Sequence, residues 1–351
     1  MGAVLVTGGA GFIGSHLCER LVREGREVVC LDSFDNFYPR EIKLRNIEPL
    51  KTEERFHLYE GDIRDPAILE DLFGHHDLEA VVHLAARAGV RPSLEMPRLY
   101  ADVNVTGTAT LLEHCRAFKV RSFVFGSSSS VYGNSDSVPF SESVPAAQPV
   151  SPYAATKRAG ELLAHAYHHL YGMDIACLRF FTVYGPRQRP EMAIHKFTRL
   201  IDRGEELPIY GDGSSARDYT YVDDIVGGVT AAIGKAEGYQ IINLGRSEVV
   251  TLGDLVGHIE RALGKQARLV ARVEQPGDVR QTCADVSLAR RILGYEPLVG
   301  IQEGIGRFVD WYREQPQSEN SPDSSFHEPV PTISSRLSRR PARCLRSPRR
   351  P

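Results

Sequence analysis

Residues 3–14 read AVLVTGGAGFIG, an apolar run that passes directly into a glycine-rich turn. The run predicts a buried strand, and the residues after Gly11 predict the start of a helix. Gly8 would allow the tight turn, Gly11 would let the backbone approach a pyrophosphate, and Gly14 would permit close packing of the helix on the strand. The first N–H groups of the helix would then face phosphate oxygens. This stretch therefore predicts a nucleotide-binding strand–turn–helix unit.

Short apolar runs and helical segments alternate through the first half of the chain. The expected strands are residues 3–7, 27–32, 55–60, 80–84, 122–125 and 175–180, and the expected helices are residues 12–24, 66–73, 99–118 and 152–171. Nearly continuous apolar strands, such as AVVHL at residues 80–84, are typical of a parallel sheet covered on both faces. The alternation predicts an α/β fold with a doubly wound parallel Rossmann sheet, whose ligands lie outside the carboxyl ends of the strands.

Asp32 ends the second expected strand, 18 residues after Gly14. A carboxylate at this place accepts hydrogen bonds from the adenosine ribose and repels a 2′-phosphate. Residue 33 is serine and the next arginine is Arg40, so the sequence favours NAD over NADP. Two further segments, GDI at residues 61–63 and LAA at residues 84–86, follow strands on the same edge. The full set of candidate cofactor-binding residues is Gly8, Gly11, Phe12, Ile13, Gly14, Asp32, Asp62, Ile63, Leu84, Ala85, Ala86, Asn104, Tyr153, Lys157 and Phe180.

The composition changes twice further along the chain. After Gly185 a stretch rich in Pro, Gly and charge begins a region of shorter elements that continues to about Tyr312. From Gln315 the chain is rich in Ser, Pro and Arg, a composition that buries too little apolar surface to offset its ordering entropy. We therefore expect residues 1–185 to form mainly the NAD-binding Rossmann domain. Residues 186–312 would form mainly a smaller C-terminal substrate-binding lobe with some interleaving, and residues 315–351 a disordered tail.

Bulk properties exclude several classes of protein. The formal net charge of −3 gives no electrostatic reason to expect a nucleic-acid partner. No apolar stretch reaches the length of a membrane span, and the N-terminus lacks a signal-peptide pattern. The six cysteines are scattered without metal-ligand spacing, so buried, reduced thiols are expected and no metal site. These observations together predict a cytoplasmic enzyme with no membrane partner.

The sequence SPYAATK at residues 151–157 reads as a helix start, with Ser151 as the N-cap and proline in the first turn. Tyr153 and Lys157 are four residues apart and share one helix face. The lysine ammonium, together with a positively charged nicotinamide, would lower the pKa of the phenol and favour its phenolate as a base. A serine-rich strand end at residues 127–130 would add hydroxyls that hold the substrate oxygen.

These motifs together resemble the extended short-chain dehydrogenase/reductase family, and within it the nucleotide-sugar epimerases. The resemblance covers about residues 3–312 and includes GGAGFIG, GDIRD, HLAA, SSSSVYG, SPYAATK, GPRQRP and ARDYTYVDD. It implies that Ser128 is the catalytic hydroxyl and that Tyr153 and Lys157 are the base and its partner. It also implies a homodimer formed through helices at residues 99–118 and 152–171.

Two serines narrow the choice within that family. Related 4,6-dehydratases carry Asp-Glu at the positions of Ser129 and Ser130, and UDP-glucuronate decarboxylases carry Glu at the second. Without an acid or base beside C5, those reactions lose a proton-transfer agent worth roughly 10²- to 10⁴-fold. Epimerisation at C4 needs none, because one tyrosine takes the proton of the 4-hydroxyl and returns it.

The segment FFTVYGPRQRP at residues 180–190 resembles the UDP-glucuronate 4-epimerases, in which Thr182 and Arg189 would meet the sugar carboxylate. Such a clamp has a chemical purpose, because a 4-keto glucuronate is a β-keto acid that loses CO₂ when its carboxylate aligns with the carbonyl. The resemblance therefore implies NAD-dependent 4-epimerisation of UDP-glucuronate. UDP-glucose or UDP-N-acetylglucosamine 4-epimerisation is the alternative. A net dehydrogenase and a non-catalytic NAD-binding regulator are more remote alternatives.

The remaining substrate-binding residues come from the resemblance alone. Arg217 matches the arginine that binds the pyrophosphate, and Asp278 matches the carboxylate that holds the uridine ribose. Many relatives carry arginine where this chain has Gln275, so Arg280 would take over that contact. The full candidate set for the UDP-sugar is Ser128, Ser129, Tyr153, Thr182, Arg189, Arg217, Asp278 and Arg280.

Overall fold

The apolar run Ala3–Thr7 forms β1, a fully buried strand near the middle of a parallel sheet. The structure is a computed structural model that describes residues 2–135, 137–211, 213–272 and 281–316. Within these residues the sheet has seven strands in the order β10-β6-β5-β4-β1-β2-β3, and every adjacent pair is parallel. Its other members are β2 (Val28–Asp32), β3 (Phe56–Glu60), β4 (Leu78–His83), β5 (Ser122–Ser128), β6 (Asp174–Phe180) and β10 (Tyr239–Leu244).

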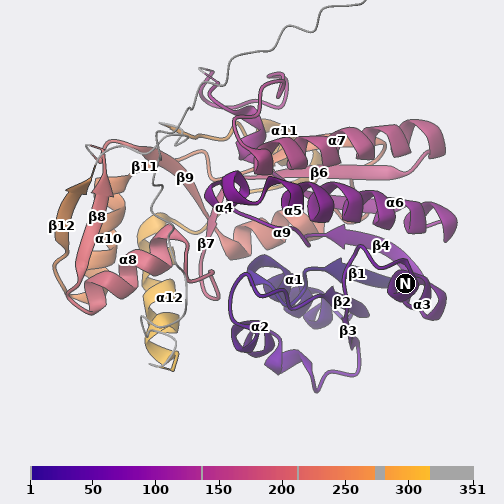
Figure 1. The fold of residues 1–351 in the computed structure, drawn as a ribbon, viewed down its shortest axis with the longest axis horizontal. Coiled ribbons are helices and arrows are strands. Elements are labelled where there is room, and N and C mark those ends of the chain that lie inside the picture. The colour runs from indigo at the N-terminus through magenta and orange to yellow at the C-terminus, as the bar shows by residue number, and fades with distance from the viewer. Residues whose placement is uncertain (1, 136, 212, 273–280, 317–351) are drawn as a thin grey trace, which may run out of the picture.

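Helices cover both faces of this sheet (Figure 1). Successive residues of β1 alternate between two apolar cores, with Val4 and Val6 in one and Leu5 in the other. The first core includes side chains of α1 (Phe12–Arg23) and α9 (Val222–Ala232). The second includes side chains of α3 (Pro66–His75), α6 (Gly107–Ala117) and α7 (Pro152–Tyr171). The doubly wound Rossmann fold expected from the sequence is therefore confirmed.

The order in which strands are added to the sheet reverses between β1 and β4, although all the strands stay parallel. From β1 the strand order runs through β2 to β3, and the chain then crosses back to add β4, β5 and β6 on the other side. At such a switch point the connections diverge and leave a crevice outside the carboxyl ends of the strands. The glycine turn after β1 and the segment after β4 both open into this crevice.

The second half of the chain interleaves with the sheet and also forms a smaller lobe. It supplies β10, which pairs with β6, and α9, which packs against α1. The lobe contains α8 (Ala193–Asp202), α10 (Leu252–Leu263) and α12 (Ile301–Glu314). It also contains the parallel pair β8 (Glu206–Tyr210) and β12 (Arg268–Arg272), together with a sheet in the order β11 (Val249–Thr251), β9 (Ala216–Tyr221) and β7 (Thr182–Tyr184). Figure 1 shows this lobe beside the carboxyl ends of the Rossmann strands.

Several helices differ from those expected. The predicted helix at residues 99–118 is continuous in chain order but has three parts: α5 (Pro97–Ala101), a π-helical turn η2 (Asp102–Thr106) and α6. The helices α2 (Arg40–Asn46) and α4 (Val90–Glu95) were not predicted, because each is too short to show a clear apolar period. The helices of the second half, from α8 to α12 and including α11 (Ser287–Leu293), were not predicted individually, because the sequence was read there only as a region of shorter elements. None of the described helices combines the length and apolarity needed to cross a bilayer. The predicted tail from residue 315 lies almost entirely outside the described residues.

Candidate active site

A cavity of about 430 Å³ lies at the crevice between β1 and β4. It extends from the glycine turn after β1, past the ends of β4 and β5, to the start of β7. Most of the expected cofactor and substrate residues line it together. They are Gly8, Gly11, Phe12, Ile13, Gly14, Asp32, Asp62, Ile63, Leu84, Ala85, Ala86, Ser128, Ser129, Tyr153, Lys157, Phe180, Thr182 and Arg189.

The glycine turn has the geometry that a dinucleotide requires. Gly8 has φ +71°, and a Cβ on it would lie 2.8 Å from the backbone nitrogen of Ala85. A Cβ on Gly14 would lie 2.2 Å from the carbonyl oxygen of Gly8, so the close approach of helix and turn demands glycine there. Gly11 is the N-cap of α1 and offers no side chain to the first helical amides. The amides at the positive end of this helix therefore face the cavity without a side-chain cap, which fits a pyrophosphate.

Asp32 is buried at the carboxyl end of β2. Its two carboxylate oxygens accept the amides of Ala10 at 3.1 Å and Phe34 at 2.8 Å. Burial raises the pKa of Asp32, and the ammonium of Lys43, 4.0 Å away, opposes that rise. Each carboxylate oxygen retains a lone pair that could accept a ribose hydroxyl. These residues fit the adenosine half of NAD.

Tyr153 and Ser128 both line the cavity, Ser128 at the end of β5 and Tyr153 at the start of α7. The helix starts as predicted, because the Ser151 hydroxyl accepts the amide of Ala154 at 3.1 Å. Burial raises the pKa of Tyr153, while a hydrogen bond with Ser128 and the positive charge of Arg189 lower it. The net effect raises the pKa, and the hydroxyl and the guanidinium offset part of the cost of forming the phenolate. These neighbours place the phenol where it can exchange a proton with a substrate hydroxyl.

Lys157 makes a contact that the sequence did not predict. Its ammonium donates to the carbonyl oxygen of Gly126 at 2.6 Å and lies 5.0 Å from the ring centroid of Phe125. Burial lowers the pKa of Lys157 to about 8, and the carboxylate of Glu161 opposes that shift. The expected effect of the ammonium on the phenol is thus not the leading one in this structure. Here burial raises the pKa of the phenol, and a hydrogen bond with Ser128 and the charge of Arg189 lower it.

The two arginines of the segment after β7 have different surroundings. Arg189 lines the cavity, where its guanidinium lies 5.5 Å from the ring centroid of Phe37 and its Nε is 2.9 Å from Glu191. Arg187 instead pairs with Glu19 of α1 at 2.5 Å, outside the cavity lining. Thr182 is the first residue of β7 and faces the same cavity as Arg189. Only one of the two arginines can therefore contact a ligand bound there.

Two of the predicted residues that the structure describes, Asn104 and Arg217, do not line the cavity. Asn104 is buried in the π-helical turn, where its side chain contacts the backbone of Arg87 at 2.8 and 3.0 Å and the Thr156 hydroxyl at 3.0 Å. It therefore positions the segment after β4 against the catalytic helix. Arg217 is on β9 and donates to the carbonyl oxygen of Ala216 at 2.9 Å. Asp278 and Arg280 lie outside the described residues.

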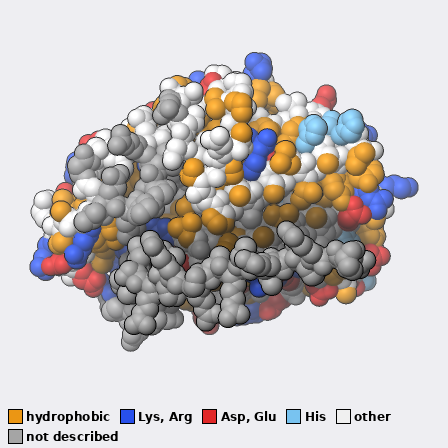
Figure 2. Space-filling model, turned by 45° about the horizontal axis from the view of Figure 1, so that its top comes forward, with side chains coloured by type: hydrophobic (Ala, Val, Ile, Leu, Met, Phe, Trp, Pro, Cys, Tyr) orange, Lys and Arg blue, Asp and Glu red, His pale blue; other side chains and the backbone are white. Residues whose placement is uncertain are grey.

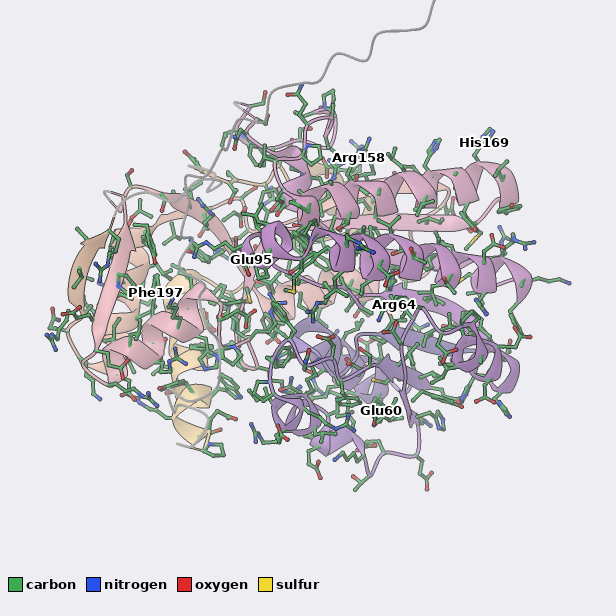
Figure 3. All side chains as sticks on the ribbon, in the orientation of Figure 1. Glu60, Arg64, Glu95, Arg158, His169 and Phe197 are labelled. Carbon is green, nitrogen blue, oxygen red and sulfur yellow. The ribbon has the colours of Figure 1, made fainter. Side chains whose placement is uncertain are left out.

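The cavity also contains side chains that the sequence did not predict. Several come from the loop after β2, namely Asp35, Phe37 and Tyr38, and Lys43 comes from the following helix. Arg87, in the segment after β4, forms an ion pair with Asp35 of this loop and lies 5.2 Å from the ring centroid of Phe37. Arg64, labelled in Figure 3, follows β3 and is held by Asp62 at 2.7 Å. The available signal was the unusual density of aromatic residues in FDNFY, in a loop that would otherwise be polar.

Comparison with known proteins finds relatives that match most of the chain. Residues 5–308 match the family model described as GDP-mannose 4,6 dehydratase. A UDP-glucuronate 4-epimerase of Thermodesulfobacterium geofontis is 44% identical over 315 residues, which cover 90% of this chain and 97% of that protein.

Solved structures give the same result. The UDP-glucuronic acid 4-epimerase of Bacillus cereus, in complex with UDP-glucuronic acid and NAD, has a TM-score of 0.84 at 39% identity and covers 89% of this chain and 99% of its own. The UDP-glucose 4-epimerase of Thermotoga maritima with UDP-glucose has a TM-score of 0.82 at 33% identity, covering 89% and 98%. This chain therefore belongs to the GDP-mannose 4,6 dehydratase family of extended short-chain dehydrogenases/reductases.

Proposed function

We propose that this chain is an NAD-dependent UDP-sugar 4-epimerase that interconverts UDP-glucuronate and UDP-galacturonate. The observation that carries the proposal is that one cavity joins the glycine turn, Tyr153 and Ser128 to Thr182 and Arg189. The glycine turn fits a dinucleotide, and Tyr153 and Ser128 fit a substrate hydroxyl that is to be oxidised. Thr182 and Arg189 fit a substrate carboxylate. The relatives named above, which include UDP-glucuronate 4-epimerases, support the same assignment.

The described side chains account for the proton transfers. Tyr153 would take the proton of the sugar's 4-hydroxyl and give it back to the same oxygen, with the Ser128 hydroxyl fixing that oxygen beside the phenol. Lys157 would donate to the carbonyl oxygen of Gly126 and supply positive charge in the cavity lining. NAD⁺ bound along the glycine turn would accept the hydride from C4 of the sugar, and the resulting NADH would return a hydride to C4.

The serines after β5 favour epimerisation over elimination or decarboxylation. Ser128 donates to the Ser130 hydroxyl at 3.0 Å and caps the short 3₁₀ helix Ser129–Tyr132. Ser129 and Ser130 line the cavity where related enzymes place carboxylates. Hydroxyls in these positions cannot move a proton at C5 near neutral pH. The 4-keto sugar would therefore be reduced again, with either face presented to the hydride.

Arg189 and Thr182 would restrain the C6 carboxylate during that interval. A guanidinium has five N–H donors, so its pairing with Glu191 through Nε leaves donors for a substrate carboxylate. Holding the carboxylate away from the carbonyl π-system prevents loss of CO₂ from the 4-keto sugar. This role distinguishes UDP-glucuronate from UDP-glucose, which has a hydroxymethyl group in the same place.

We include a homodimer and a cytoplasmic location in this proposal. The helices α5, η2, α6 and α7 pack side by side, and Figure 2 shows hydrophobic side chains gathered on this face. On α7, Leu162 is 55% exposed and Leu170 is 64% exposed, eight residues apart on one helix face. Pairing α7 with its copy would cover these leucines in a four-helix arrangement.

The cytoplasmic location rests on the cysteines. The free thiols of the described cysteines favour a reducing compartment.

The decisive experiment supplies the purified protein with UDP-glucuronate or UDP-glucose and adds no NAD. We expect UDP-galacturonate to form until equilibrium, with NADH never exceeding the enzyme concentration. The variant Tyr153→Phe should retain the fold and the cofactor but lose turnover by at least about 10²- to 10⁴-fold. A faster conversion of UDP-glucose would favour the hexose epimerase. NADH formed in proportion to substrate would favour a dehydrogenase, and cofactor binding without conversion of either sugar would favour a regulator.

A further inference from the structure

Two histidines and a glutamate meet at the amino ends of β2 and β3, at the opposite end of the strands from the cavity. Glu27 immediately precedes β2, and His57 is the second residue of β3. His76 follows α3 as its C-cap. Strand β3 is the edge of the sheet (Figure 1). The three side chains therefore join the edge strand, its neighbour and the helix that covers them.

The distances between their ligand atoms suit a tetrahedral metal ion. The Nε2 atom of His57 is 3.0 Å from Oε1 of Glu27, and the Nδ1 atom of His76 is 3.6 Å from the same oxygen. The ligand atoms of the three residues all lie within 4.8 Å of one another. Zn²⁺ bonds to histidine nitrogen and carboxylate oxygen at about 2.0–2.2 Å, so tetrahedral ligands are about 3.3–3.5 Å apart. The observed separations bracket this value for the two pairs that include Glu27.

Tyr59 sets the orientation of the His76 ring. Its hydroxyl lies 3.0 Å from Nε2 of His76, the nitrogen that faces away from the cluster. When Nε2 carries the proton and donates to this hydroxyl, the lone pair of Nδ1 points toward Glu27 and His57. Histidines that bind metals usually donate their other ring N–H to an outer partner in this way. Tyr59 is two residues after His57, so both point to the same face of β3.

We propose that Glu27, His57 and His76 form a Zn²⁺ site that ties the end of α3 to the edge of the sheet. The Glu27 and His57 side chains are 46% and 37% exposed, so water can reach the fourth position of the ion. This composition, with two histidines and one carboxylate, is one that Zn²⁺ prefers. The site is separate from the epimerisation site: Asp32, which lines the cavity, lies five residues beyond Glu27 along β2, roughly 17 Å away at the rise of an extended strand. Epimerisation therefore should not depend on the ion.

The test uses the full chain without a histidine tag, after treatment with a chelator and dialysis. Zn²⁺ alone is titrated by calorimetry, and the melting temperature is followed over the same concentrations. We expect one saturable high-affinity site and a melting temperature that rises with Zn²⁺ until the site is full. His57→Gln and His76→Gln should each weaken binding more than tenfold and abolish the rise. Tyr59→Phe should weaken binding roughly 10- to 100-fold, the usual effect of losing an outer partner.

His75→Gln is the matched control. His75 adjoins His76, but it is exposed and pairs with Asp71 at 3.2 Å, so its loss should leave Zn²⁺ binding unchanged. The proposal is overturned if the wild type shows no saturable binding. It is also overturned if the variants of His57 and His76 bind as the wild type does, because other histidines would then hold the ion. Circular dichroism of each variant shows that a lost response does not come from unfolding. Epimerase activity is measured separately, so failure of either proposal is recognised by itself.

Discussion

The guanidinium of Arg179 donates to both carboxylate oxygens of Glu161, from Nε to Oε1 at 2.8 Å and from Nη2 to Oε2 at 2.9 Å. Both side chains are buried, and Ser127 donates to the same carboxylate at 2.7 Å. Glu161 is one turn after Lys157 on α7, and Ser127 immediately precedes Ser128. This buried ion pair therefore ties the catalytic helix to β5 and β6 directly behind the reacting groups.

Replacing Glu161 with Gln should destabilise the protein by about 3–5 kcal/mol, because a buried guanidinium would lose its counter-charge. Although burial raises the pKa of Glu161, hydrogen bonds and charge from Arg179 hold it below the ordinary value. Its contribution should thus be present above the unfolded pKa and be lost as the pH falls. Urea denaturation at several pH values measures both effects. Arg158→Gln, which removes the more exposed partner of Glu161, is the control and should cost at most about 1 kcal/mol. Equal losses for the two variants would contradict the prediction.

Lys157→Met should make the protein more stable and inactive. Burial lowers the folded-state pKa to about 8 from the reference value of 10.5. Below pH 8 both states carry the charge, so the folded state bears the full cost of burying it. Between pH 8 and 10.5 the unfolded state binds more protons, and the stability of the wild type rises by up to about 1.4 kcal/mol per pH unit. The advantage of the variant should therefore be largest below pH 8 and shrink as the pH approaches 10.5.

Thermal unfolding from pH 7 to 10.5 measures that advantage. The exposed Lys119, replaced by Met, is the control and should give a difference from the wild type that does not change over this range. A Lys157→Met advantage that stays constant with pH would show that packing is responsible and not the buried charge.

Arg189→Ala should impair turnover of UDP-glucuronate far more than any turnover of UDP-glucose. The lost charge-assisted contact corresponds to about 1.5–3 kcal/mol, or roughly 10- to 150-fold in kcat/KM. Thr182→Ala should act in the same direction but less strongly, because a neutral hydroxyl is lost. A carboxylate released from the clamp can reach the decarboxylating alignment, so a UDP-pentose should appear among the products.

Arg187→Ala is the matched control, because this arginine belongs to the same loop but faces Glu19. Arg187→Ala should lower the turnover of both substrates equally or leave both unchanged. If Arg189→Ala also lowers the turnover of both substrates equally, Arg189 supports the loop or the diphosphate. The hexose epimerase would then be the better assignment.

The double variant Leu162→Glu/Leu170→Glu should convert the proposed dimer into a monomer. Four charges placed at the centre of a two-fold helical interface would be buried without partners. Light scattering after size exclusion, at micromolar concentration, gives the mass of each form. Leu298→Glu alters a leucine that is 78% exposed but lies in the segment between α11 and α12, so it should leave the mass unchanged. A wild-type monomer would refute the dimer itself.

The sequence by itself determined the features that depend on local chemistry. The glycines of the first turn, the carboxylate that ends β2 and the helix cap at Ser151 are each specified by neighbours in the chain. For this reason β1 and α7 were predicted with the bounds that the structure has. The four-residue spacing of Tyr153 and Lys157 likewise fixes their shared helix face, whatever the rest of the molecule does.

Only the tertiary structure decided which distant residues would meet. The strand β10 joins β6 across more than 60 residues, and Arg87 pairs with Asp35 across 52. The turning of Arg187 toward α1 and of Arg189 toward the cavity depends on the positive φ at Arg187 and on Glu19, 168 residues earlier. Such contacts form only when long loops close around a packed core, and their free energy depends on burial that no local pattern records. Local propensity therefore placed the reacting groups, while packing chose their partners.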